Sequence, residues 1–137
     1  MANIHKFTEN IKSDVAMNIA TLNNSANTPT YYSMANYDLA VFLVFSGTLA
    51  DTSAVTLQMR QRVGAAGDEA NVGTAGALTG TDDNEVNVLQ VRGEELDVDS
   101  GNDRVGILCT ETATQNAELG VICLRLRARY KQATLPA

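Results

Sequence analysis

Segments in which apolar and polar side chains alternate recur along the whole chain, and clusters of turn-forming residues separate them. In the clearest segment, residues 54–63, Val55, Leu57 and Met59 share one parity and are expected to face a core. The other parity is polar and is expected to face solvent: Thr56, Gln58, Arg60 and Arg62. A period of two is the repeat of a half-buried β-strand, whereas no long segment has the 3.6-residue repeat of an amphipathic helix.

Seven or eight short strands with loops between them predict an all-β protein. The segments expected to form strands or to pair locally are 14–21, 31–34, 37–45, 54–63, 77–79, 85–91, 94–98, 104–112 and 117–131. We therefore expect an antiparallel β-sandwich of jelly-roll or immunoglobulin-like connectivity, two topologies that the pattern does not separate. A chain of 137 residues holds one domain, which we place at 14–137.

Two segments stand apart from the alternating pattern. Residues 37–45 are apolar on both parities, which predicts a strand buried on both sides at the centre of the core. Residues 1–13 are mixed and polar, with Ile4, Phe7 and Ile11 spaced at three and four. This segment is expected to form either a short amphipathic turn or an extended N-terminal arm whose isolated apolar side chains contact a partner.

The composition excludes several kinds of chemistry. His5 is the single histidine, so a histidine-based zinc site or a catalytic pair with serine or cysteine is not expected. No run approaches the ~20 apolar residues of a membrane span, and the N-terminus lacks an apolar leader. Sixteen acidic against ten basic residues argue against direct binding of nucleic acid. We expect a protein that is made in the cytoplasm, is not an enzyme, and uses no metal or other cofactor.

Charge is distributed unevenly along the chain. Residues 82–103 contain eight acidic residues against one base, Arg92. The last strand instead carries a ridge of positive charge on one parity, which we expect to face outward: Arg125, Arg127, Arg129 and Lys131. This ridge is either a solvated strand face or a docking surface for an acidic partner. The acidic and basic regions are expected to pair within one subunit, or head-to-tail between identical subunits.

Two smaller features have ordinary structural explanations. Residues 97–103 are rich in Asp but miss the EF-hand spacing, because glycine falls at the fifth position and Leu108 at the twelfth. A tight turn is the favoured interpretation, with an irregular Ca²⁺ loop as the alternative. Cys109 and Cys123 lie seven residues on either side of Asn116, at the centre of an expected final hairpin, and are expected to be reduced and buried.

Residues 31–63 resemble a known family. Tyr31-Tyr32 and Met34 precede Asn36-Tyr-Asp38, the apolar run Leu39–Phe45 and Ser46-Gly47, and an Ala54-Val-Thr-Leu-Gln58 strand follows. This pattern is similar to that of β-sandwich structural proteins from the head gene clusters of tailed bacteriophages, including capsid decoration (cement) proteins. It covers about a quarter of the chain, and Tyr31-Tyr32 stands where the family usually has Trp.

The resemblance implies a non-enzymatic virion protein that binds the outer surface of the major capsid protein lattice and stabilises the head. It also implies a homo-oligomer, most often a trimer. The expected contacts with the capsid or with other subunits are Ile4, Phe7, Ile11, Arg125, Arg127, Arg129 and Lys131. A neck, collar or tail component is the alternative within this class. A Ca²⁺- or carbohydrate-binding β-sandwich module is the alternative from another class.

Overall fold

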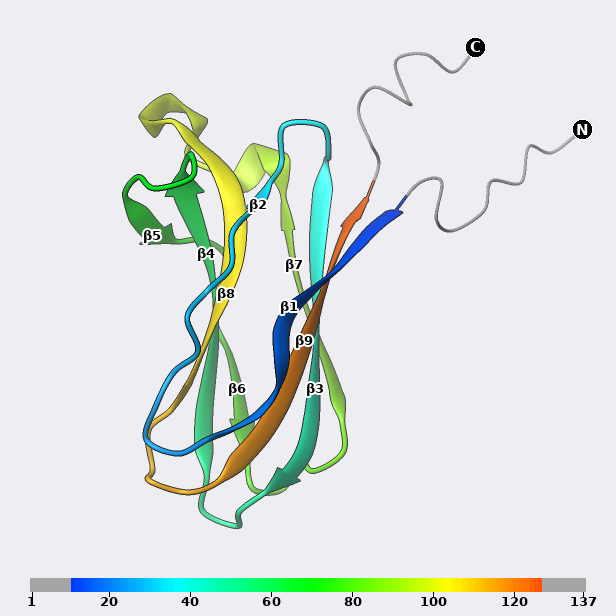
Figure 1. The fold of residues 1–137 in the computed structure, drawn as a ribbon, viewed down its shortest axis with the longest axis vertical. Helices are drawn as coiled ribbons and strands as arrows, with labels where there is room; N and C mark the ends of the chain where they lie inside the picture. Colours follow the sequence, from blue (N-terminus) through cyan, green and yellow to red (C-terminus); the bar gives the residue numbers. More distant parts are fainter. Residues whose placement is uncertain (1–10, 127–137) are drawn as a thin grey trace, which may run out of the picture.

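Two antiparallel sheets stack face to face in the computed structural model, which describes residues 11–126 (Figure 1). The first sheet has the order β1-β9-β3-β7, and the second has the order β2-β8-β4-β5 with β6 also paired to β4. The strands are β1 (Ile11–Leu22), β2 (Tyr32–Ser33), β3 (Leu39–Leu49), β4 (Ala54–Val63), β5 (Glu69–Asn71), β6 (Gly76–Thr79), β7 (Val86–Arg92), β8 (Asn102–Glu111) and β9 (Ala117–Leu126). The prediction of an all-β antiparallel sandwich is confirmed.

The connections between strands select the jelly-roll topology. Apart from the β4–β5–β6 segment, successive strands alternate between the two sheets, so that β1, β3, β7 and β9 form one sheet while β2, β4 and β8 belong to the other. This alternation also makes the expected hairpin at 113–116 wrong, because that loop crosses from one sheet to the other. Cys109 and Cys123 consequently lie on β8 and β9 in different sheets and are not cross-strand neighbours.

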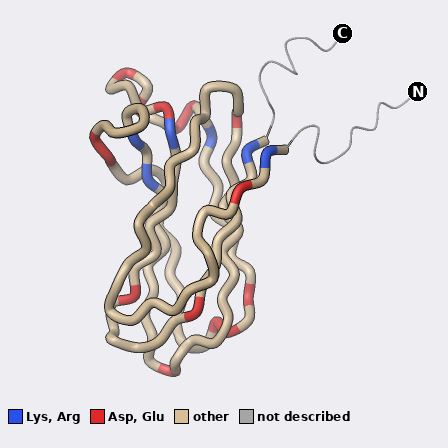
Figure 2. Tube along the Cα trace, in the orientation of Figure 1, with Lys and Arg blue, Asp and Glu red and all other residues tan. Residues whose placement is uncertain are grey.

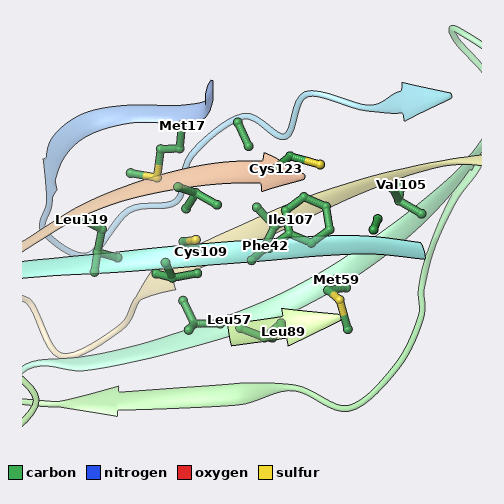
Figure 3. Close-up of a cluster of buried hydrophobic side chains, with 14 of the residues drawn as sticks. Met17, Phe42, Leu57, Met59, Leu89, Val105, Ile107, Cys109, Leu119 and Cys123 are labelled. Carbon is green, nitrogen blue, oxygen red and sulfur yellow. The ribbon is translucent and has the colours of Figure 1, made fainter. Parts of the chain in front are cut away.

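The core between the sheets is built from medium-sized side chains. Figure 3 shows residues of both sheets, among them Phe42, Leu57 and Ile107, filling this space. Each of the three is at most 1% exposed. Val55, Leu57 and Met59 are buried as the alternation in residues 54–63 predicts. Thr56 is exposed, and the three longer polar side chains of the other parity are half-buried on the outer face of the second sheet.

Strand β3 is central but is not buried on both sides. Ala40, Phe42 and Val44 are fully buried against the core, whereas Leu39 to Phe45 on the other parity are half-buried. The sandwich has two layers, so no third layer covers the outer face of the first sheet within the described part of the chain. The apolar character of that second face therefore requires another explanation.

The first strand begins earlier than expected and changes parity along its length. Ile11 pairs with Leu126, so residues 11–13, expected in the arm, belong to β1. Register shifts between Val15 and Met17, and again between Met17 and Ala20, interrupt the ladder. As a result Met17 is buried, whereas Val15 and Ile19 face solvent, although all three share a parity in the sequence.

Residues 94–98 form helical turns instead of the expected strand. The 3-10 helices η1 (Gly93–Glu95) and η2 (Val98–Ser100) occupy this stretch. A Glu95 carboxylate oxygen accepts the backbone N–H of Arg92 at 2.6 Å, and an Asp97 oxygen accepts that of Ser100 at 3.2 Å. Gly101, at φ 88°, ends the second turn. Side chains that bond to nearby backbone groups favour such turns over a strand, which also supports the turn assigned to 97–103.

A buried carboxylate holds together three segments at the lower end of the sandwich in Figure 1. Glu111, at the end of β8, is 1% exposed. Its two oxygens accept the backbone N–H groups of Asn24 (2.7 Å), Ala113 (2.8 Å), Gln115 (3.2 Å) and Ala54 (3.4 Å). Burial alone would raise the pKa of this carboxyl, but the four N–H donors together outweigh it and lower the pKa.

Candidate interaction surface on the first sheet

The outer face of the first sheet is apolar across all four strands. The register places Val15 opposite Ile122, Ile122 opposite Leu43, and Leu43 opposite Val88. Directly opposite residues of neighbouring strands project from the same face, so these four side chains form one continuous row. The rows on either side add further apolar residues. We call the set the apolar face: Val15, Ile19, Leu39, Val41, Leu43, Phe45, Val86, Val88, Ile122 and Leu124.

This face is open to solvent. Val15 is 62% exposed, Ile19 78%, Val86 56% and Val88 60%, and within residues 11–126 these are four of the five large apolar side chains that are exposed. The face spans four rows of residues on four strands, and the spacings give it roughly 20 Å by 15 Å before side-chain relief is counted. Contiguous exposed apolar patches larger than a few hundred Å² are rare on monomeric proteins and mark sites of interaction.

A shallow hollow of about 340 Å³ lies at the β1 side of the apolar face. Val15, Ile19, Phe45 and Ile122 line it together with the backbone of Gly120. Ile19 crosses over Gly120, where an added Cβ would lie 2.9 Å from the Ile19 Cγ1 atom. The bulges of β1 bring Ile19 to this position. The hollow is thus a concave, mainly apolar part of the face.

Charged groups border the apolar face but do not enter its central rows. Arg92 stands opposite Leu39 at one corner, and Glu118 lies over Gly47 at the other end of the sheet. Figure 2 shows every Lys and Arg of the described chain in the upper half, whereas Asp and Glu occur at both ends. An apolar centre with a polar rim is the anatomy of a protein–protein interface.

Arg125 lies on the inner side of β9, so the expected parity of this strand is reversed. Ala117, Leu119, Val121 and Cys123 face the core, and Arg125 lies on the same side of the strand, while Leu124 faces outward.

The Arg125 side chain is 12% exposed, and its Nη2 lies 3.0 Å from Asp14 Oδ2. Its Nη1 donates to the Ser33 carbonyl oxygen at 2.8 Å. Its guanidinium lies 4.8 Å from the Tyr37 ring centroid and 5.4 Å from that of Tyr32. Its charge is therefore engaged within the subunit.

Of the other expected contact residues, the structure places one. Ile11 is half-buried at the start of β1, opposite Leu126, at the upper corner of the apolar face. Ile4, Phe7, Arg127, Arg129 and Lys131 lie outside residues 11–126. Apart from Ile11 at its corner, the apolar face includes none of the expected contact residues, although doubly apolar β3 and the Val86–Val88 pair were signals of it in the sequence.

Other chemistry is sparse in the described residues. Between Ile11 and Leu126 no group of three or more His, Cys, Asp or Glu side chains could hold a metal ion. Cys109 and Cys123 are free thiols, both fully buried, and burial raises the pKa of each to about 12. The described helices are two short 3-10 turns, and neither is a candidate membrane-spanning segment.

Comparisons with known proteins connect this fold to prophage and viral structures. No family model matches the sequence, and no curated protein matches it. The SPBc2 prophage-derived protein YomS is similar in structure, with a TM-score of 0.52 and 11% identity over 85% of this chain and 93% of YomS. A chain in the structure of infectious bursal disease virus, Gx strain, has a TM-score of 0.52 and 9% identity over 85% of this chain. The match spans 32% of that viral chain. At these identities the likeness shows a shared fold.

Proposed function

We propose that this protein is a non-enzymatic structural component of a phage virion, a decoration protein that binds the outer surface of the major capsid protein lattice. The observation that carries the proposal is the apolar face, a wide, uncharged surface that a free subunit leaves in water. The resemblance of residues 31–63 to head-cluster proteins supports the same assignment. The fold shared with YomS is consistent with it.

The apolar face is suited to docking on a rigid lattice. Its side chains project from four hydrogen-bonded strands, so little backbone ordering opposes binding. Burying apolar area contributes roughly 25 cal/mol per Å², and the exposed valines and isoleucine supply this area at the centre of the contact. Gln90, Arg92 and Glu118 at the border provide polar groups for the rim.

The first and last described residues lie side by side at one corner of this face. Ile11 pairs with Leu126 in the ladder of β1 and β9 (Figure 1). Ten extended residues reach at most about 35 Å, which exceeds the width of the sheet. We propose that Ile4 and Phe7 add apolar contacts with the capsid beyond this corner. Arg127, Arg129 and Lys131 would contribute positive charge to the same contact with the capsid. Assembly as a homotrimer would present three such surfaces together.

The proposal is tested by adding the purified protein to expanded capsids that lack it. We expect the protein to sediment with the shells at saturating stoichiometry and to raise the temperature at which they rupture. Attachment to isolated necks or tails, with none to shells, would instead assign it to the neck or tail alternative. Binding to neither would remove the virion assignment.

A further inference from the structure

Three arginines cluster on the outer face of the second sheet, opposite the side that carries the apolar face. Arg60 and Arg62 project from β4 and Arg104 from β8. The register places Arg62 directly opposite Arg104. Like charges in directly opposite positions of an antiparallel pair destabilise the sheet. The register thus places two cationic side chains at neighbouring positions on one face, where a carboxylate partner would be favourable.

The arginine cluster is only partly neutralised within the subunit. Glu69 of β5 is the carboxylate nearest to it, with oxygens 3.9 Å from Arg60 Nη2 and 3.8 Å from Arg62 Nη1. Arg104 makes no ion pair with any residue between 11 and 126, and the adjacent Asp103 accepts the backbone N–H of Gly64 instead. The Nε atoms of all three arginines are buried without a hydrogen-bond partner. The Arg62 guanidinium lies 5.0 Å from the Tyr31 ring centroid, which holds it in place.

The opposite end of the same molecule has the complementary charge. Asp51 lies in the β3–β4 loop, Asp82, Asp83 and Glu85 lie in the β6–β7 loop, and Glu118 is near the start of β9. Figure 2 shows no Lys or Arg at this end of the described chain. Asp82 and Asp83 accept the backbone N–H groups of Thr79 and Leu49, at 2.7 and 2.8 Å. Asp51 and Glu85 are exposed, and neither side chain makes an ion pair among the described residues.

We propose that the arginine cluster binds the acidic lower end of a second copy of this chain. One head-to-tail contact reduces the repulsion among the arginines and the repulsion among the carboxylates, because each arginine gains carboxylate partners and each acidic end gains cations. Since the contact joins two different patches, it generates a ring or an open chain of subunits. The arginines lie on the outer face of the second sheet and the carboxylates lie at the lower end of the molecule, so the central rows of the apolar face stay free for docking. The inference goes beyond the proposed function and does not depend on it.

The test compares self-association of two variants with the same change in charge. In sedimentation velocity at low salt, we expect the wild-type protein to associate, and 0.5 M NaCl to disperse it because the contact is electrostatic. Arg104→Glu should weaken association by about tenfold or more. Lys12→Glu, which changes an exposed residue of β1 by the same two charges, should leave it unchanged. Arg104→Glu should not lower the Tm, because it replaces the Arg62–Arg104 pair of like charges with an Arg62–Glu pair of opposite charges.

Charge exchange gives the decisive control. Glu85→Lys alone should also weaken association, and an equimolar mixture with Arg104→Glu should restore it, because the carboxylate introduced in one variant pairs with the ammonium introduced in the other. Equal association of the wild type and Arg104→Glu would overturn the inference, as would a wild type that stays monomeric at low salt. If association resists salt and is lost in Val88→Asp, self-association occurs through the apolar face and the inference is overturned. The capsid-binding test remains a separate measurement.

Discussion

Arg125 Nη2 lies 3.0 Å from Asp14 Oδ2, and this ion pair joins the two strands that begin and end the described fold. Strands β1 and β9 are neighbours at the edge of the first sheet. The rings of Tyr32 and Tyr37 border the guanidinium and restrict its access to water. The Ser33 carbonyl oxygen fixes its orientation and ties the β2 segment of the other sheet to β9.

Replacing Arg125 with Met should destabilise the protein by about 2 kcal/mol, because a partly buried Asp14 loses its partner. Asp14→Asn should cost less, because the arginine keeps its carbonyl and aromatic contacts. Urea unfolding of both single variants and of the double variant gives the coupling energy. A coupling energy near zero would show that solvent screens this ion pair as it does an exposed one, which would contradict its stabilising role.

Glu111 should make the protein sensitive to acid. Its pKa in the folded state lies below the ordinary value of 4.5, so its contribution to stability is fully present above that value. The contribution is lost as the pH falls below about 4.5 towards the folded pKa. Glu111→Gln should lower the Tm at pH 7, since an amide NH₂ group cannot accept the N–H groups that a carboxylate oxygen accepts. The gap in Tm between wild type and variant should narrow from pH 5 to pH 3; a constant gap would contradict this role.

The two thiols should be chemically silent in the folded protein. Cys109 and Cys123 are fully buried, and burial raises the pKa of each to about 12, so almost no thiolate forms at pH 8. A colorimetric disulfide reagent should therefore label neither thiol in the native state and both in 6 M guanidinium chloride. Rapid labelling of the native protein would show that the core opens easily.

Deleting residues 2–10 should leave the Tm nearly unchanged, because β1 begins at Ile11. Binding to capsids should weaken if Ile4 and Phe7 anchor the protein. The double variant Ile4→Ser, Phe7→Ser keeps the length of the segment and should weaken binding by a similar factor. Full binding by both variants would remove the arm from the docking mechanism.

The fold class was predicted correctly from the sequence, because the alternation of apolar and polar residues shows directly which side of a strand is buried. Strand β4 alternates without interruption, and its boundaries and buried side were predicted correctly. The short pairings at Tyr32–Ser33 and Gly76–Thr79 were also anticipated. The strand predicted at residues 94–98 was wrong because Glu95 and Asp97 accept hydrogen bonds from nearby backbone N–H groups, which favours turns and which hydropathy does not record.

The candidate surface was not predicted, because where both faces of a strand are apolar the sequence does not show which face is the core and which is the outer surface. On β9, Leu124 looked like a core residue and Arg125 like a surface residue, but their sides are the reverse. The outer apolar face is the reason for this error, since alternation identifies the core only when the other face is polar. On β1, two register shifts moved Val15 and Ile19 outward, and the sequence carries no glycine or proline there to signal a bulge.

The central claim, that the apolar face is the capsid-binding surface, is tested most directly by one charge placed in it. Val88→Asp adds a carboxylate at a position that is 60% exposed, so the folded subunit should tolerate it. Thr56→Asp places the same charge at an exposed position of the second sheet and serves as the control. In co-sedimentation with capsids that lack the protein, we predict that Val88→Asp binds at least about tenfold more weakly than Thr56→Asp. Equal binding by the two variants, both with wild-type Tm, would contradict the account.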